Sequence, residues 1–167
     1  MAIFASKQKV MLSLNYLTSI LFPDNLPDME GIESKEQVLE ARAGMGGAVQ
    51  LLQSKNLPVA IVLEHAEQHQ LSLRNDGGFH ECTQSVWIME MKAYNEEEAE
   101  VMERCYQRFK RLYSIMLHHH ELGDAELGRW IETNEMNAYD REAGSYVGYE
   151  VFIHFREDED LSYVPRN

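Results

Sequence analysis

Apolar residues between positions 96 and 120 recur every three or four residues, which is the period of an amphipathic α-helix. Asn95 and Glu98 have the spacing of a capping pair at the start of this segment, and acidic residues there complement the helix dipole. We therefore predict one long helix, from about Glu96 to His120, whose apolar stripe covers a sheet. The stripe consists of Met102, Cys105, Phe109, Leu112 and Met116.

Runs rich in β-branched and aromatic residues lie on both sides of this helix and predict strands. Asn75-Asp76-Gly77-Gly78 predicts a tight hairpin between two of them, because these residues tolerate positive φ. Val86–Met91 carries apolar side chains on both faces, so we expect a central strand that is covered on both faces. The predicted strands are Pro58 to Leu63, a segment with Leu71 and Leu73, Val86 to Met91, Trp130 to Met136, and Tyr149 to Phe155.

The last strand alternates between apolar and polar positions, with Val151 and Ile153 on one face and Glu150 on the other. We expect the first face to join the core and the second to be largely solvated. A polar connection that contains Asp140 and Gly144 is predicted before this strand.

A helix is also predicted at the N-terminus, from Ser6 as its cap to about Phe22, where Pro23 ends it. Its apolar face carries Val10, Leu14, Leu17 and Leu21. The polar segment from Asp24 to Gly31 predicts an exposed connection, which makes this helix an arm.

Ser34 and Gln37 have capping-box spacing and predict a further helix that continues through Val38 and Leu39 to Leu52. Three glycines near residue 45 weaken it, so we expect a break or a kink there. Together the elements predict an α+β fold, with a mixed, mostly antiparallel sheet packed against one long helix and with additional N-terminal helices. Residues 1–31 are expected to form the arm and its connection, and residues 32–167 a single domain.

Charge limits the possible partners. The 167 residues include 15 basic and 28 acidic ones, and the net charge of −13 opposes binding to nucleic acid or to anionic membrane surfaces. The same charge opposes self-association at low salt, so we expect salt to promote assembly.

Cysteine usage and hydropathy bear on the compartment. Cys82 and Cys105 form no CxxC pair and are expected to be reduced thiols. The segment after Lys7 and Lys9 loosely resembles a signal peptide, but Asn15 interrupts it, and no segment has the 18 or more apolar residues of a membrane span. We therefore expect a cytoplasmic protein.

Histidines supply the candidate metal ligands. His118, His119 and His120 are consecutive, and neighbouring helical residues point about 100° apart, so they do not readily close on one ion. A metal would need His120 with Asp124 and partners from elsewhere in the chain. His65 and His69 have the spacing of an HExxH motif, but in a strand they would lie about 13 Å apart.

Other residue groups match catalytic or cofactor motifs only in part. Gly44-Met45-Gly46-Gly47 is not followed by the Lys of a phosphate-binding loop and is interpreted as helix packing or a kink. Cys105 falls on the helical stripe, where a buried, inert thiol is expected. Trp87, Trp130 and Tyr149 are expected to fill the core. We therefore assign no catalytic, cofactor-binding or metal-binding residue and expect no enzyme activity.

The order of elements from Pro58 to Tyr163 resembles that of phage tail terminator and neck proteins. The resemblance rests on the Asn75-Asp76-Gly77-Gly78 hairpin, the Asn95 to His120 helix and the closing strand that begins at Gly148, and it covers about two thirds of the chain. The first helix, from Ser6 to Phe22, departs from the pattern of that family.

The resemblance implies a non-enzymatic structural subunit of a phage or prophage head–tail junction or tail end. Such a subunit would form a homo-oligomeric ring, contact other tail or neck proteins, and reside in the host cytoplasm before it enters a virion. Exposed strand edges and the N-terminal arm are the contacts that we expect between subunits. Two alternatives remain: a small metal- or ligand-binding protein that uses His118–His120, and an adaptor whose acidic surface binds a basic partner.

Overall fold

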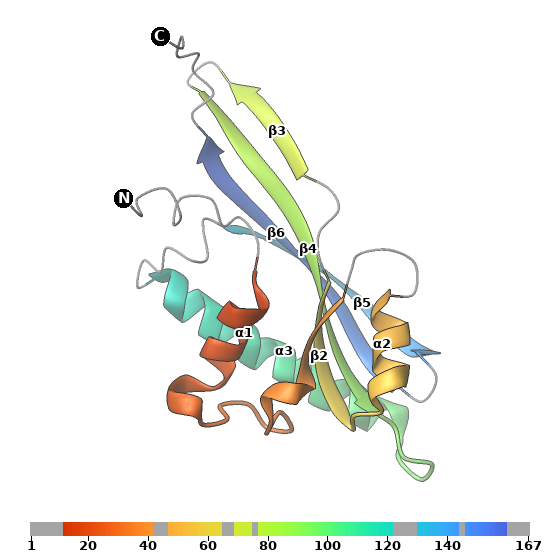
Figure 1. Ribbon diagram of the computed structural model, residues 1–167. Helices are drawn as coiled ribbons and strands as arrows, with labels where there is room; N and C mark the ends of the chain where they lie inside the picture. The colour runs from red at the N-terminus through yellow and green to blue at the C-terminus, as the bar shows by residue number, and fades with distance from the viewer. Residues whose placement is uncertain are drawn as a thin grey trace.

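The computed structural model describes residues 12–41, 47–64, 69–74, 77–121, 130–143 and 146–159 (Figure 1). The helices in these ranges are α1 (Leu14–Leu21), the 3-10 helices η2 (Pro23–Asn25) and η3 (Lys35–Gln37), α2 (Gly47–Lys55) and α3 (Glu98–Glu121). The strands are β1 (Val38–Ala41), β2 (Val59–Glu64), β3 (His69–Arg74), β4 (Gly77–Met91), β5 (Trp130–Ala143) and β6 (Tyr146–Glu159).

The described strands form one sheet in the order β1-β2-β4-β6-β5, with β3 pairing with β4 beside this path. β1 and β2 are parallel, with Val38 opposite Ile61, and the other pairs are antiparallel. The predicted α+β class is therefore confirmed, including the mixed, mostly antiparallel sheet and the long helix α3.

β4 connects two parts of the sheet. Its residues Ser85–Glu90 pair with β2, and its residues Gly77–Cys82 pair with β3, with Arg74 opposite Gly77 as the predicted hairpin requires. β6 pairs with β4 on the other side along its length. In Figure 1, β3 and the adjoining ends of β4 and β6 extend beyond the helices. We call these three segments (His69–Arg74, Gly77–Cys82 and Phe155–Glu159) the β-arm.

The central strands are buried on both faces, as predicted for Val86–Met91. Val86 and Ile88 belong to a core that includes residues of α1 and α3, whereas Trp87 and Met89 belong to a second core with residues of α2. Ile88 and Met89 are both fully buried. Because burying one such side chain contributes about 1.5–3 kcal/mol, each face of β4 adds to stability.

α1 begins later than its sequence pattern predicts. Ser13, not Ser6, is the cap, and its hydroxyl accepts a hydrogen bond from the Tyr16 amide at 3.1 Å; residues 6–11 of the predicted helix lie outside the described ranges. Leu17 and Leu21 are fully buried in the core that also contains Cys105 of α3. The described part of the expected arm therefore packs against the sheet and α3, while a domain division at residue 31 stays a prediction.

The prediction of a helix from Ser34 to Leu52 is wrong in its first part. Ser34 and Gln37 do form a capping box, but it closes only the single turn η3. The Gln37 side chain also donates to the carbonyl oxygens of Gly31 at 2.7 Å and Val59 at 3.0 Å. These bonds hold the chain beside β2, so Val38 and the next residues extend as β1, and the helix begins only at Gly47.

Three smaller predictions are also corrected. Asn95 does not cap α3, because the helix begins at Glu98; the turn before it is closed by Glu96, whose carboxylate accepts from the Ala93 amide at 3.0 Å. Asp140 lies within β5 and not in a connection, since β5 continues to Ala143. Glu150 is 6% exposed instead of solvated, because its face of the sheet contributes to the second core.

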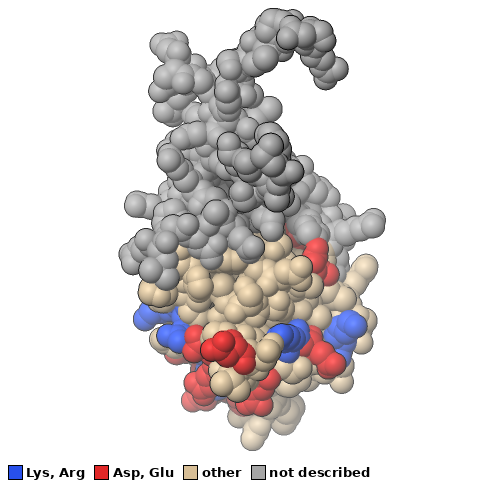
Figure 2. Space-filling model, turned by 60° about the vertical axis from the view of Figure 1, so that its left-hand side comes forward, with Lys and Arg blue, Asp and Glu red and all other residues tan. Residues whose placement is uncertain are grey.

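Acidic and basic side chains are interspersed on the face of the molecule that Figure 2 shows, where they form a band below the undescribed region. Among the described residues on that face, this distribution gives no extended basic surface for a phosphate backbone, and the net charge of −13 opposes such binding. Within the described residues, no helix combines the length and the apolar character that crossing a bilayer requires.

Candidate functional site

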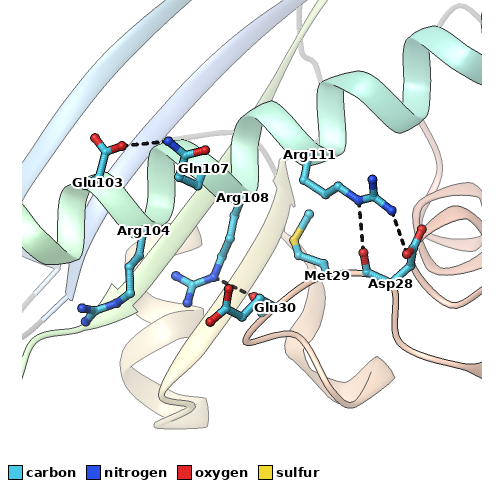
Figure 3. A pocket seen from close by; sticks show the side chains of 8 residues that line it. All are labelled: Asp28, Met29, Glu30, Glu103, Arg104, Gln107, Arg108 and Arg111. Atoms are coloured by element: carbon cyan, nitrogen blue, oxygen red, sulfur yellow. Dashed lines mark hydrogen bonds and ion pairs between the residues drawn. The ribbon is translucent and has the colours of Figure 1, made fainter.

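A pocket of about 330 Å³ lies between α3 and the connection that follows α1. Side chains from α3 line one side of it and the connection lines the other (Figure 3). The lining residues are Asp28, Met29, Glu30, Glu103, Arg104, Gln107, Arg108 and Arg111. The five residues from α3 recur at helical spacing, so their side chains lie along one face of the helix.

Arg108 is the most buried of the three arginines, with an 8% exposed side chain. Its Nη1 lies 2.9 Å from a carboxylate oxygen of Glu90 in β4, and its Nε donates to the carbonyl oxygen of Glu30 at 2.9 Å. Arg108 thus joins the helix, the sheet and the connection. Because both ions of the pair are largely removed from water, loss of either partner is costly.

Gly31 lies directly against Arg108. Its φ is +86°, and a Cβ at this position would stand 2.7 Å from Nη2 of Arg108. Glycine is therefore favoured at this position for two reasons, the left-handed backbone and the close approach of the guanidinium. This backbone conformation and this close approach allow the connection to form one wall of the pocket.

Arg104 links the pocket to the loop that precedes α3. Its guanidinium donates to both carboxylate oxygens of Glu90 at 3.0–3.2 Å and to Glu96 at 2.6 Å, and these carboxylates raise the pKa of Arg104. The Ala93 amide, followed by Arg104, lowers the pKa of Glu96. The loop is therefore held to α3 by a charged network in which Arg104 bridges Glu90 and Glu96.

Arg111 closes the other end of the pocket. It forms an ion pair with Asp28 at 2.8 Å, and the two side chains are 53% and 37% exposed. Exposed pairs of this kind contribute about 0–1 kcal/mol, so this contact is easily exchanged for another. This end of the pocket therefore has an arginine that can exchange its partner for a ligand.

The lining of the pocket combines three guanidinium groups with three carboxylates, one amide and one thioether. The eight lining residues include no Ser, Cys, His, Tyr or Lys. Cys105 lies behind Arg108 and is fully buried, and burial raises the pKa of its thiol to about 11. The prediction of a buried Cys105 is therefore confirmed, and the thiol is protonated at neutral pH. What the pocket offers is guanidinium groups, carboxylates and the apolar surface of Met29 and the arginine stems.

The predicted histidine candidates lie elsewhere. His118 and His119 are on α3 beyond the pocket, and the His119 ring packs edge-on against Tyr16 of α1 with 6.3 Å between ring centroids. His65 and Asp124 lie outside the described residues, as do the side chains of His69 and His120. In the part of the chain whose side chains are described, no three His, Cys, Asp or Glu residues are arranged to hold a metal ion.

The remaining sequence candidates are only partly placed. Trp87 is buried in the second core as predicted, and Tyr149 packs against the first core. The side chains of Trp130 and Cys82 lie outside the described part. Gly44, Met45 and Gly46 also lie outside it, and Gly47 is the first residue of α2.

A buried polar cluster on the α2 face of the sheet was not predicted. The Ser85 hydroxyl lies 2.9 Å from a carboxylate oxygen of Glu64 and 2.9 Å from one of Glu150, and the Trp87 indole donates to Glu64 at 3.0 Å. A hydroxyl has one proton and so donates to one carboxylate at a time. These residues come from three strands, and only the observed register brings them together.

The pocket residues themselves were not predicted from sequence as a site. The signal available was the repeat of arginines along α3 at positions 104, 108 and 111, which resembles an ordinary solvated helix face. Their role depends on the connection that packs across them. The sequence matches no protein-family model and no curated protein.

Proposed function

We propose that this chain is a non-enzymatic structural subunit of a phage or prophage head–tail junction or tail end, and that it assembles into a homo-oligomeric ring. The observation that carries the proposal is the β-arm, which extends beyond the helices in Figure 1. A small sheet gains stability when it packs against a helix or further strands, and neighbouring subunits of a ring can supply that packing for the β-arm.

The order of the elements also supports the proposal. A strand, a hairpin, a central strand, one long helix and two closing antiparallel strands follow one another as β2, β3, β4, α3, β5 and β6. This is the succession on which the resemblance to tail terminator and neck proteins rests. Many unrelated functions share simple α+β layouts, so the order supports the proposal less than the β-arm does.

Two edges of the sheet, β1 and β5, are poorly suited to open-ended pairing. β1 has four residues, and the pairing of β5 with β6 shifts register twice, between Trp130 and Asn134 and between Asp140 and Ala143. Short edge strands and bulges discourage the addition of further strands. We therefore assign the contacts of the ring to the β-arm and to the surface around α3 in preference to the expected strand edges.

The test is the mass of the assembly in solution. Light scattering and sedimentation velocity across protein concentration and ionic strength should show one closed oligomer, favoured by salt because salt screens repulsion between chains of charge −13. Electron microscopy of the same sample should show rings. A monomer under all conditions would contradict the proposal, and so would open-ended filaments, because a ring contact must close.

A further inference from the structure

We propose that the pocket between α3 and the connection receives the side chain of Tyr94 from a second copy of this chain. The inference rests on the proposed assembly and specifies one of its contacts. It depends on three properties of the described residues: the display of Tyr94, the shape and chemistry of the pocket, and the charges around both.

Tyr94 is exposed on a loop whose backbone is held by hydrogen bonds. Its exposed fraction is 103%, the highest among the exposed large hydrophobic side chains of the described part of the chain. The loop is closed by two hydrogen bonds between Ala93 and Glu96, at 3.0 and 3.2 Å. Glu96 is in turn bound to Arg104. These bonds fix the backbone that carries Tyr94, so the loop itself loses little conformational freedom on binding, and tyrosine is typical of interface anchors.

The pocket has the size and chemistry for an aromatic side chain. At about 330 Å³ it lies near the lower end of the range of about 300–1,000 Å³ for ligand pockets, which suits one side chain better than a nucleotide. Met29 and the stems of the arginines provide apolar contact. Guanidinium groups stack on aromatic faces, so Arg104 and Arg111, which are 38% and 53% exposed, are suitable partners for a tyrosine ring.

The charges around the pocket and around Tyr94 favour contact between two copies of this acidic chain. The lining contains three arginines and three acidic residues, so it is neutral on a chain with a net charge of −13. Tyr94 is followed by Glu97 and Glu100, both exposed. When the loop enters the pocket, these carboxylates approach the arginines of the second copy, and Arg111 can exchange its exposed pair with Asp28 for one of them.

Tyr94 is the anchor of such a contact and not the whole of it. An aromatic side chain buries about 150–250 Å², whereas a stable interface buries about 1,200–2,000 Å². The remaining area belongs to the surroundings of α3 and to the other contacts of the ring. Anchors of this kind carry a large share of the affinity, so one substitution at Tyr94 is expected to weaken assembly strongly.

Two substitutions test the contact from its two sides. Tyr94→Ala removes the anchor. Gln107→Trp fills the pocket from an exposed position. Within the described residues, the side chain of Gln107 makes a hydrogen bond only to Glu103, so little else is lost. Each should weaken self-association by at least about thirtyfold, measured by sedimentation. Tyr94→Phe keeps the ring and should assemble. Gln53→Trp, on the exposed face of α2, is the matched control for a new tryptophan and should also assemble.

Mixing the two weakened variants identifies the partner as a second copy. The Gln107→Trp chain keeps its Tyr94, and the Tyr94→Ala chain keeps an open pocket, so an equimolar mixture should form a complex of the two that neither forms alone. Failure of the mixture to associate would overturn the assignment of Tyr94 to this pocket. Circular dichroism of each variant must match that of the wild type, since both changes are at exposed positions.

The outcomes separate this inference from the proposed function. A wild-type protein that is always monomeric contradicts the ring and this contact together. A wild-type ring that persists in both Tyr94→Ala and Gln107→Trp contradicts the contact alone and leaves the ring in place. Loss of assembly in both variants, with pairing of the two variants in the mixture, supports both.

Discussion

The side-chain amide of Gln84 holds the backbone of Leu12 at two points. The Leu12 amide donates to Oε1 of Gln84 at 2.7 Å, and Nε2 of Gln84 donates to the Leu12 carbonyl at 3.1 Å. Both residues are buried, at 1% and 2% exposure. Gln84 therefore pairs with the segment before α1 as a neighbouring strand would, across 72 residues of sequence, and fixes where that segment meets the sheet.

Gln84→Leu should lower the free energy of unfolding by about 2–4 kcal/mol. The substitution keeps the volume of the side chain but leaves the amide and the carbonyl of Leu12 buried without these partners, and each unsatisfied group costs about 1–3 kcal/mol. Urea denaturation measures the difference. Gln53→Leu on the exposed face of α2 is the control and should change stability by less than about 0.5 kcal/mol. Equal effects of the two substitutions would contradict the role of Gln84.

Gly31→Ala should destabilise the protein by about 2 kcal/mol, because the φ of +86° is unfavourable for alanine and the new Cβ displaces the guanidinium of Arg108. The two causes can be separated by repeating the substitution in an Arg108→Met background. There the steric part is removed and only the backbone part remains, so the cost should be smaller. Unfolding curves of the four proteins give the coupling, and a cost that is the same in both backgrounds would show that the guanidinium yields freely.

Glu90→Gln should be among the most destabilising single changes at the pocket, with a cost of about 3 kcal/mol. Glu90 is 13% exposed and neutralises both Arg104 and the nearly buried Arg108. Arg104 retains the Glu96 carboxylate, but Arg108 keeps no carboxylate partner among the described residues, where its other oxygen partner is the Glu30 carbonyl. Thermal or urea unfolding measures the loss, and Glu33→Gln, at an exposed position of the connection, should be close to neutral. A similar result for both would mean that the network adds little.

Sequence periodicity predicted correctly the elements in which the spacing of apolar residues matches the pattern of burial. The stripe that contains Cys105, Leu112 and Met116 is buried as predicted, and the apolar run of Val86–Met91 is the centre of the sheet. β3 and β4 pair as the Asn75 to Gly78 hairpin predicts, with Arg74 opposite Gly77 on either side of two residues that lie outside the described ranges. In these cases the local pattern and the tertiary environment favour the same structure.

Sequence reasoning was wrong where a side chain acts over a long distance. Gln37 has a helical capping-box spacing, but its amide binds Gly31 and Val59, and the next residues form a strand. Glu150 was expected to be solvated, yet Ser85 of the neighbouring strand contacts it in the interior. The pocket was missed for the same reason: its arginines are at ordinary surface spacing, and only the packing of the connection across α3 makes them a site.

Stability should decline in alkaline solution partly because of Cys105. Burial raises the pKa of its thiol from an ordinary 9.0 to about 11. Below pH 9 the thiol is protonated in both the folded and the unfolded chain, so the contribution of Cys105 to the free energy of unfolding is complete. Between pH 9 and 11 the unfolded thiol ionises first, which stabilises the unfolded chain, and that contribution is lost. A difference of two units corresponds to about 3 kcal/mol. Tyr146 and Tyr149, whose pKa values burial also raises, act in the same direction.

The contribution of Cys105 is isolated by comparing two proteins. The first is the Cys82→Ala variant, whose remaining thiol is Cys105, and the second carries Cys105→Ala in addition. Urea midpoints should fall with pH in both proteins, since the two tyrosines remain, but the fall between pH 9 and 11 should be steeper when Cys105 is present. Cys105→Ala itself leaves a small cavity, which lowers stability by a constant amount at all pH values. A constant difference between the two proteins from pH 7 to 11 would therefore show that the Cys105 thiol ionises as readily in the folded chain as in the unfolded one.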